Sequence, residues 1–217
     1  MKDTFRQALQ ARDRARSVMM CLDALQTGTT SVPVLYEDII APVLNSLAVP
    51  EEQINELIWQ EHAMSSIVRS IVEAAYPYVL REREALGLQI ARSILVFCPA
   101  RETHELGARM VADFYQIAGY DVIYLGADTP EMTILQAICH LKPDYLSISV
   151  TNPYNLFEAR RLIRRLREQA GYDLEVLAGG YAFAADPSTV AATGVDRLLH
   201  RFSDILELRN REEVNAE

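Results

Sequence analysis

The fold is decided by the stretch Ile94-Leu95-Val96-Phe97 and by the segment Glu102-Thr103-His104-Glu105-Leu106-Gly107 that follows it. The first predicts a buried parallel strand, and the second stands where that strand should give way to a helix. Ligands of open α/β sheets bind at the carboxyl ends of the strands. His104 is therefore expected at a position from which an imidazole can reach a metal ion.

After Gly87 the chain alternates short β-rich runs with helical patterns. The predicted strands are Ile94–Phe97, Val122–Leu125, Tyr145–Val150, Glu175–Ala178 and a weaker run near Arg197–Leu199. The helical patterns between them are Leu106–Ala118, Glu131–Leu141 and Leu156–Gln169. This alternation predicts a flavodoxin-like (Rossmann-like) α/β fold with a doubly wound, five-stranded parallel sheet and right-handed crossovers.

The first part of the chain has helical periodicity and predicts a small helical bundle. The segment Gly28–Ser31 separates a first helix from a second, and Pro50 stands where a third should begin. Pro77 is expected to kink or divide this last helix. The predicted divisions are a helical bundle, a sheet domain and a loose polar tail, at residues 1–87, 88–210 and 211–217.

The composition argues against nucleic acid as a direct partner. The formal net charge is −9, whereas binding to a phosphate backbone needs a basic face. The basic run from Arg160 to Arg165 has the spacing of the solvated face of a helix. No apolar stretch approaches the ~18 residues that span a bilayer, and the N-terminal residues Met1–Arg6 are too polar for a secretory signal. We therefore expect a cytoplasmic protein without membrane contact.

The three cysteines, Cys21, Cys98 and Cys139, stand apart from one another in apolar surroundings. None belongs to a Cys-x-x-Cys pair, so neither a disulfide framework nor a zinc site is indicated. All three are expected to be buried thiols.

Two further elements, each at the end of a predicted strand, follow the histidine segment. They are Ser149-Val150-Thr151 and Gly179-Gly180. With the histidine segment they resemble the signature of the cobalamin-binding domain, which reads Asp-x-His-x-x-Gly, then Ser-x-Leu, then Gly-Gly. Each element alone also fits an ordinary turn, a surface histidine or a loop hydroxyl. The three in register favour the cobalamin-binding family.

The resemblance implies that His104 replaces the corrinoid's own benzimidazole as the lower cobalt ligand, an arrangement called base-off, His-on. The family aspartate that holds the other ring nitrogen is replaced here by Glu102, which is longer by one methylene. A hydrogen-bond partner at that nitrogen fixes the tautomer and tunes the basicity of the ligand. Gly107 would let the backbone turn closely beneath the cofactor.

The same resemblance places Ser149 beside the displaced nucleotide tail of the cofactor, with Thr151 where the family usually has leucine. Gly179 and Gly180 have no Cβ, so the chain can pass close to a nucleotide there. The implied cofactor is cobalamin, as adenosylcobalamin, methylcobalamin or hydroxocobalamin.

In proteins of this family, a helical segment before the sheet often covers the upper face of the corrin. Trp59, Glu61 and His62 are the residues expected there. Glu61-His62 resembles a Glu-His pair in the cap of light-sensing, adenosylcobalamin-dependent regulators, and His62 would then lie near the upper axial position. Those regulators carry a tryptophan where this chain has Glu51, and Trp59 does not replace it. The alternative places Trp59 in the bundle core and His62 as a partly exposed helix residue.

Two functions follow from the resemblance. One is a cobalamin-dependent sensor or regulator that acts through a protein partner, and the other is a corrinoid methyl carrier of a methyltransferase system. Methyl carriers typically continue the motif as His-Asp-Ile-Gly, whereas His104 is followed by Glu105-Leu106-Gly107, a form more common in regulators. Neither function makes the chain a complete enzyme, and homo-oligomer formation is left open.

A third class is a flavodoxin-like domain that binds another ligand or only a protein. Flavin or dinucleotide binding requires a glycine-rich phosphate turn after the first strand. The segment Cys98-Pro99-Ala100-Arg101 supplies none.

Overall fold

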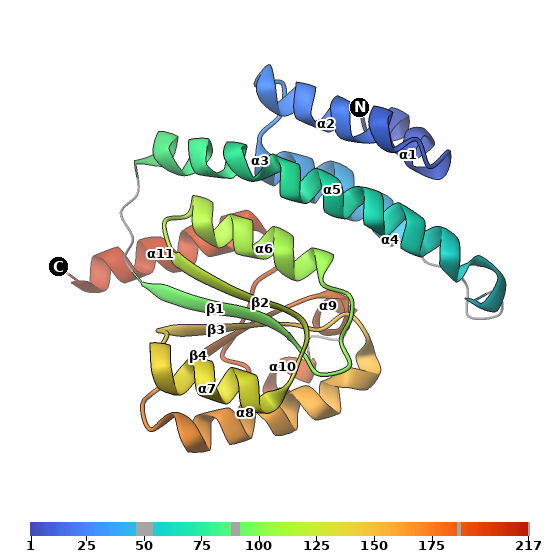
Figure 1. Ribbon diagram of the computed structural model, residues 1–217. Helices are drawn as coiled ribbons and strands as arrows, with labels where there is room; N and C mark the ends of the chain where they lie inside the picture. The colour runs from blue at the N-terminus through green and yellow to red at the C-terminus, as the bar shows by residue number, and fades with distance from the viewer. Residues whose placement is uncertain (47–53, 88–91, 186–187, 217) are drawn as a thin grey trace. The chain divides into compact units, whose positions relative to one another are not determined.

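The computed structural model describes residues 1–46, 54–87, 92–185 and 188–216. The chain divides into two compact units, Met1–Ala85 and Leu86–Glu217. The described part of the first unit is helical, and the second unit contains the sheet (Figure 1).

The second unit is built on a five-stranded parallel sheet with the order β2-β1-β3-β4-β5. The strands are β1 (Ser93–Pro99), β2 (Asp121–Thr129), β3 (Tyr145–Ser149), β4 (Glu175–Gly179) and β5 (Arg197–Leu198). Each falls on a predicted strand, and β1 and β2 are longer than predicted. The order confirms the doubly wound, flavodoxin-like sheet.

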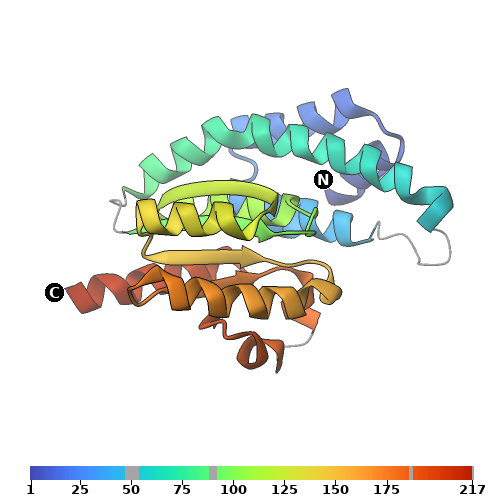
Figure 2. The same ribbon diagram turned by 60° about the horizontal axis from the view of Figure 1, so that its bottom comes forward.

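Helices cover both faces of this sheet. They are α6 (Leu106–Ile117), α7 (Glu131–Leu141), η3 (Pro153–Asn155), α8 (Leu156–Ala170), α9 (Tyr181–Ala185), α10 (Ser188–Thr193) and α11 (Phe202–Ala216). Helices α6 and α11 lie on one face, while α7 and α8 lie on the other (Figures 1 and 2). The prediction of a loose tail from residue 211 is wrong for its described part, because α11 continues to Ala216. This helix is anchored by the buried Ile205 and Leu208, and the polar residues after them include strong helix formers.

Strand β1 is buried on both faces, as a central strand of a parallel sheet should be. Leu95 and Phe97 belong to the core formed with α7 and α8, and Ile94 and Val96 alternate with them toward the opposite face. None of the four is more than 1% exposed. Burial on both sides is the reason why an unbroken apolar run predicted this strand correctly.

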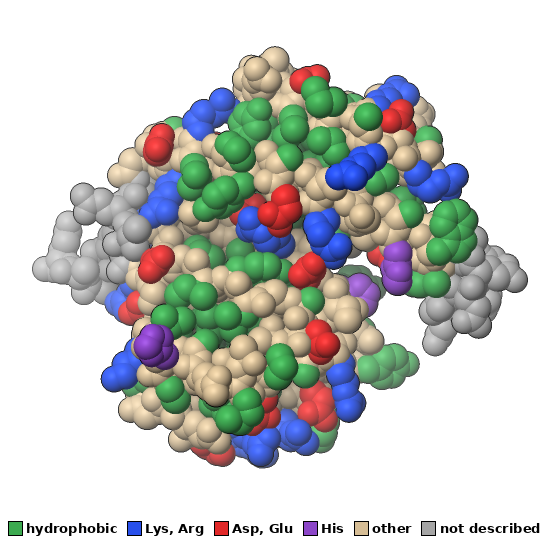
Figure 3. Space-filling model, in the orientation of Figure 1, with side chains coloured by type: hydrophobic (Ala, Val, Ile, Leu, Met, Phe, Trp, Pro, Cys, Tyr) green, Lys and Arg blue, Asp and Glu red, His purple; other side chains and the backbone are tan. Residues whose placement is uncertain are grey.

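The basic run on α8 lies on the solvent side of its helix, as predicted. Its arginines are exposed, while Leu162, Ile163 and Leu166 are buried against the sheet. Acidic and basic side chains are mixed over α8 in the space-filling view (Figure 3). The run is therefore a solvated helix face.

The prediction for the cysteines is right for two of the three. Cys21 and Cys98 are buried, whereas Cys139 is exposed on α7. The apolar face of α7 ends with Ile138, and the next residue is turned by about 100° around the helix axis. Cys139 therefore leaves the core in spite of its apolar neighbours.

The first unit is a bundle of helices with an apolar core. It contains α1 (Lys2–Gln10), α2 (Arg14–Gln26), α3 (Val32–Val34), the π-helical η1 (Leu35–Ile40), α4 (Ala41–Ser46) and α5 (Ile54–Leu86). The fully buried side chains include Phe5, Leu9, Leu35, Ile40 and Ile71. Among the described residues of both units, no helix combines the length and the apolar character that a membrane crossing requires.

Two details of this unit differ from the prediction. The first predicted helix is divided into α1 and α2, because Arg12 has a positive φ of 57° and the Asp13 carboxylate caps α2 by accepting from Arg16 N at 3.0 Å. Pro77 does not divide α5, which continues past it with Val72 and Ala75 buried before it and Val79 buried after it. Pro50, the predicted start of this helix, lies outside the described residues.

The turns after β3 and β4 pack against each other through their backbones. Val150 N donates to Gly179 O at 3.1 Å, and Val150 O accepts from Ala182 N at 3.1 Å. Between them, Gly180 has a φ of +100°, a conformation that residues with a side chain rarely adopt. A Cβ on Gly180 would lie 2.4 Å from Val150 O. The protein's own backbone therefore requires glycine at this position.

Replacement of Gly180 by alanine is expected to lower the free energy of unfolding by on the order of 3 kcal/mol, because it adds both a clash and an unfavourable φ. Gly107→Ala is the matched control, since a Cβ there would have nothing within 4 Å. The control should change stability by less than about 1 kcal/mol. Urea denaturation of both variants checks this, and equal midpoints would contradict the close contact of the two turns.

Candidate functional site

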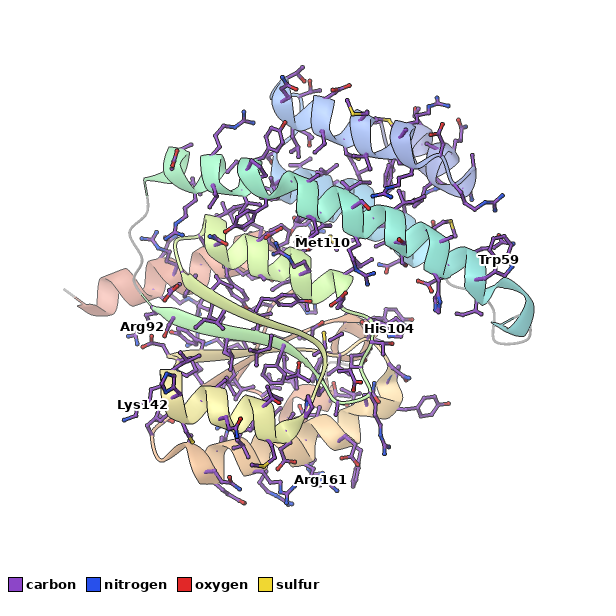
Figure 4. The ribbon with its side chains drawn as sticks, viewed as in Figure 1. Trp59, Arg92, His104, Met110, Lys142 and Arg161 are labelled. Carbon is purple, nitrogen blue, oxygen red and sulfur yellow. The ribbon has the colours of Figure 1, made fainter. Side chains whose placement is uncertain are left out.

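His104 lies at the carboxyl edge of the sheet, in the loop of residues 100–105 between β1 and α6. Figure 4 shows it at the opposite end of the sheet unit from Arg92 and Lys142. This is the edge at which ligands of doubly wound sheets bind. The position agrees with the one predicted from the sequence.

The end of β2 holds this loop in place. Asp128 N donates to Glu102 O at 2.9 Å, and Arg101 N donates to Asp128 Oδ1 at 2.7 Å. Arg101 and Asp128 both have positive φ values, 69° and 46°, which are unfavourable for residues with a Cβ. The two hydrogen bonds offset this strain and stabilise the loop in this conformation.

Glu102 has a fully buried carboxylate that joins two segments of the edge. Its Oε1 accepts from His104 N at 3.1 Å and lies 2.6 Å from His104 Nδ1. Its Oε2 accepts from Thr151 N at 3.0 Å, from Asn152 N at 2.9 Å and from Asn155 Nδ2 at 3.1 Å. One carboxylate thus connects the loop after β1 to the turn after β3.

Burial by itself would raise the pKa of Glu102, because an ionised carboxylate is costly to remove from water. The hydrogen bonds from His104, Asn152 and Asn155 outweigh burial and lower this pKa to about 2. The carboxylate is therefore ionised at neutral pH and can only accept hydrogen bonds. In a neutral imidazole, Nδ1 of His104 then carries the proton, and Nε2 bears the lone pair that can bind a metal.

The imidazole of His104 is 56% exposed although its partner carboxylate is buried. The extra methylene of Glu102, relative to the aspartate of the motif, does not prevent the contact. The distance of 2.6 Å between Glu102 Oε1 and His104 Nδ1 is typical of a short, charge-assisted hydrogen bond. The buried carboxylate thus orients the ring through Nδ1, while much of the ring stays open to solvent.

The remaining motif residues lie around the same edge. Gly107 is exposed in the first turn of α6, and a Cβ there would have nothing within 4 Å. Ser149 ends β3 and is 8% exposed, and its hydroxyl makes no hydrogen bond within the described part of the chain. Gly179 pairs with Ser149 in the sheet, and a Cβ on it would lie 3.4 Å from Leu199 O. Thr151 contributes its backbone amide to the Glu102 carboxylate.

Sequence reasoning missed three polar residues of the site. Asn152 and Asn155 donate to Glu102, and Asp128 fixes the loop after β1. Asn152 precedes Pro153 directly after a strand, and this turn signal could have drawn attention to it. Asn155 and Asp128 carry no comparable signal, because their contacts depend on how separate loops meet in space.

Trp59, Glu61 and His62 lie on α5 of the first unit. Trp59 is 55% exposed, with the Arg12 guanidinium 5.4 Å from the centre of its ring, so the alternative that places it in the bundle core is wrong. Glu61 Oε2 lies 3.6 Å from His62 Nε2, and Glu61 Oε1 accepts from Ser65 Oγ at 2.5 Å. The imidazole of His62 is 72% exposed. The structure therefore presents a Glu-His pair on the surface of this helix.

A depression of about 540 Å³ lies at the other edge of the sheet, where β4 and β5 begin. Its lining is formed by Asp173, Leu174, Glu175, Asp196, Arg197 and Arg211. Glu175 and Arg197 are paired with each other at 2.6 Å, and Asp196 accepts from Val176 N at 2.7 Å. These groups stabilise the start of the two strands.

Glu102→Ala is expected to lower the free energy of unfolding by about 3 kcal/mol at neutral pH, because it leaves buried donors without their acceptor. The sign of the pH dependence follows from the lowered pKa. The stabilisation is fully present above the ordinary carboxyl pKa of 4.5 and is lost as the pH falls toward the folded value of about 2. Chemical denaturation at several pH values should therefore show a difference between wild type and variant that shrinks in acid.

The matched control is Glu168→Ala, which removes an exposed carboxylate of α8 whose ion pair with Arg164 is 3.9 Å long. It should change stability by less than about 0.5 kcal/mol. A wild-type advantage over Glu102→Ala that stays constant down to low pH would contradict the role given to the buried carboxylate.

Comparison with known proteins identifies the domain that contains the sheet. The B12 binding domain matches residues 92–208. The chain is 25% identical over 182 residues to the HTH-type transcriptional repressor CarH of Myxococcus xanthus, an alignment that covers 83% of this chain and 58% of the repressor. It is 33% identical over 97 residues to the 2-hydroxyisobutanoyl-CoA mutase small subunit of Aquincola tertiaricarbonis, covering 44% of this chain and 71% of the subunit.

The fold is similar to that of a solved corrinoid protein. The monomethylamine corrinoid protein of Methanosarcina barkeri aligns over 94% of both chains with a TM-score of 0.78 and 15% identity. At this identity the likeness shows the fold alone.

The matched domain covers more than half of the chain, from the residue before β1 into α11. It contains the loop with His104, the end of β3 and the turn after β4. The chain spans 58% of the length of the repressor that it resembles. It belongs to the B12-binding domain family, is a cobalamin-binding protein, and has cobalamin as its cofactor.

Proposed function

We propose that this chain is a cobalamin-dependent sensor or regulatory protein that binds its corrinoid base-off, His-on and acts through a protein partner. The contact between the ionised Glu102 and His104 Nδ1 carries the proposal. It leaves Nε2 as the coordinating nitrogen of a neutral imidazole. In the base-off form the cofactor's own base is displaced, so one nitrogen from the protein can take its place.

Two further observations support a corrinoid at this edge. Gly107 leaves open space where any other residue would place a Cβ, and the protein's own packing does not require glycine there. The Ser149 hydroxyl has no hydrogen-bond partner within the described residues. Its oxygen is not among the buried unpaired side-chain atoms, so it stays accessible at the end of β3 and can hydrogen-bond to the polar nucleotide tail of the cofactor.

When bound, the corrinoid supplies a cobalt whose upper ligand can be exchanged, carried as a methyl group or released by light. The protein's part is to hold the lower ligand. Glu102 keeps the proton on His104 Nδ1 and fixes the plane of the ring. Because the same carboxylate binds the amides of Thr151 and Asn152, a displacement of the imidazole would act on the turn after β3. This turn gives the site a physical connection to the protein surface.

Three observations favour a regulatory function. The similarity to the CarH repressor extends over 83% of this chain. The motif continues from His104 as Glu105-Leu106-Gly107, and α5 carries Glu61 beside His62. In this proposal the helical unit serves as the cap of the corrin, with Trp59, Glu61 and His62 toward its upper face. The net charge of −9 favours a protein over nucleic acid as the direct partner.

The alternative is a corrinoid methyl carrier of a methyltransferase system. It is favoured by the fold, which matches the monomethylamine corrinoid protein over 94% of both chains, helical part included. In either function the chain depends on a protein partner for its effect.

Purified protein incubated with hydroxocobalamin is expected to bind it about one to one, with a visible spectrum changed by imidazole ligation. His104→Ala should abolish that spectral change, and Glu102→Ala should weaken binding about 10- to 100-fold. His140→Ala, an exposed histidine of α7, is the control and should bind as wild type does. The same bound spectrum in wild type and His104→Ala would remove His104 as the lower ligand.

Illumination separates the two functions. For a sensor, gel filtration of the adenosylcobalamin complex should show different oligomeric states in the dark and after light. A carrier should keep one oligomeric state and transfer the methyl group of bound methylcobalamin to a partner enzyme. Methyl transfer together with an unchanged oligomeric state would overturn the regulatory proposal in favour of the alternative.

A further inference from the structure

Aromatic side chains are exposed on the turns beside the histidine. Tyr154 is 86% exposed, Phe157 71% and Tyr181 61%. Together with Met132 at 63%, they are the four most exposed large apolar side chains among the described residues, and all four follow the carboxyl end of a strand. Exposed apolar groups gathered at one edge mark a binding surface more often than scattered single ones do.

The three aromatic residues come from two turns that touch each other. Tyr154 belongs to η3 and Phe157 to the first turn of α8, three positions later, so their side chains lie on the same side of this continuous helical segment. Tyr181 begins α9, which contacts η3. Its neighbours Gly180 and Ala182 are fixed against Val150, as described above. We name Tyr154, Phe157 and Tyr181 the aromatic rim.

The aromatic rim is continuous with the support of His104. Tyr154 N donates to Asn152 Oδ1 at 3.0 Å, and Asn152 N donates to the same carboxylate of Glu102 that holds the imidazole. Neighbouring strands are about 4.8 Å apart, so the turns after β3 and β4 begin about 5 and 10 Å from the turn after β1. A corrin centred on His104, with its amide side arms, extends sideways over distances of this order.

We infer that the aromatic rim binds the periphery of the corrin and determines affinity on the β3 and β4 side of the ring. The inference rests on the proposed ligation by His104. Aromatic faces pack well against the methyl groups and the planar amides that surround a corrin, and the two phenol groups can hydrogen-bond to amides. The rim would therefore recognise the ring itself, at a distance from the cobalt.

Equilibrium dialysis with hydroxocobalamin tests the rim in the full chain. The triple variant Tyr154→Ala, Phe157→Ala, Tyr181→Ala is expected to bind at least about tenfold more weakly than wild type. Its bound spectrum should be that of the wild-type complex, because His104 and Glu102 are unchanged. Tyr154→Phe with Tyr181→Phe should retain most of the affinity, since the ring faces make the contact.

Leu141→Ala is the control and should bind as wild type does. Leu141 is an exposed apolar residue at the C-terminal end of α7, away from the carboxyl edge of the sheet. Wild-type affinity in the triple variant would overturn the inference. An altered bound spectrum in the triple variant would also overturn it, by showing that the rim acts on ligation. A His104→Ala variant with the same bound spectrum as wild type is a separate result, which contradicts the proposed ligation itself.

Discussion

The carboxyl edge of the sheet depends on one buried charge, the carboxylate of Glu102. An ionised group out of water is stable only when donors surround it. Here the donors come from the histidine loop itself and from the turn after β3. Neither segment can move far without leaving the carboxylate or its donors unpaired. The positions of two separate loops are thereby fixed relative to each other and to the imidazole of His104.

The strand order explains why one carboxylate can reach both segments. In the order β2-β1-β3-β4-β5, β1 and β3 are neighbours although β2 lies between them in the sequence. The chain leaves β1 toward β2 and leaves β3 toward β4, in opposite directions along the sheet, so the loops after β1 and β3 diverge. Ligands of doubly wound sheets bind at this switch point. Glu102 lies there and holds together the loops that diverge from it.

Much of the fold could be predicted because its signals are local. The run from Ile94 to Phe97 is buried on both faces, and an unbroken apolar run is what such a strand requires. The break between α1 and α2 was missed because apolar residues recur on both sides of it, while the cause is the backbone of Arg12 and the cap by Asp13. Cys139 was misplaced because exposure on a helix changes within one residue.

One contact of the candidate site could be predicted for the same reason, because its signal is local. Glu102 and His104 are two residues apart, so their pairing is encoded in a short motif. The role of Asn155 depends on a loop that is 53 residues away in the sequence, and no pattern announces it. Gly180 was expected to make room for a ligand, but the structure gives the backbone of Val150 as a sufficient reason for glycine. Contacts between separate loops thus set the limit of what the sequence reveals.

In the proposed function, cobalt is coordinated by a protein imidazole that Glu102 holds in place. Electron paramagnetic resonance of the reduced, Co(II) cobalamin complex can identify this nitrogen, if the protein carries nitrogen-15 in its histidines. Coordination by His104 predicts that the splitting of the cobalt lines by the axial nitrogen changes from a triplet to a doublet on labelling. A triplet that persists in the labelled protein would mean that the cofactor's own base remains on cobalt, and would contradict ligation by His104.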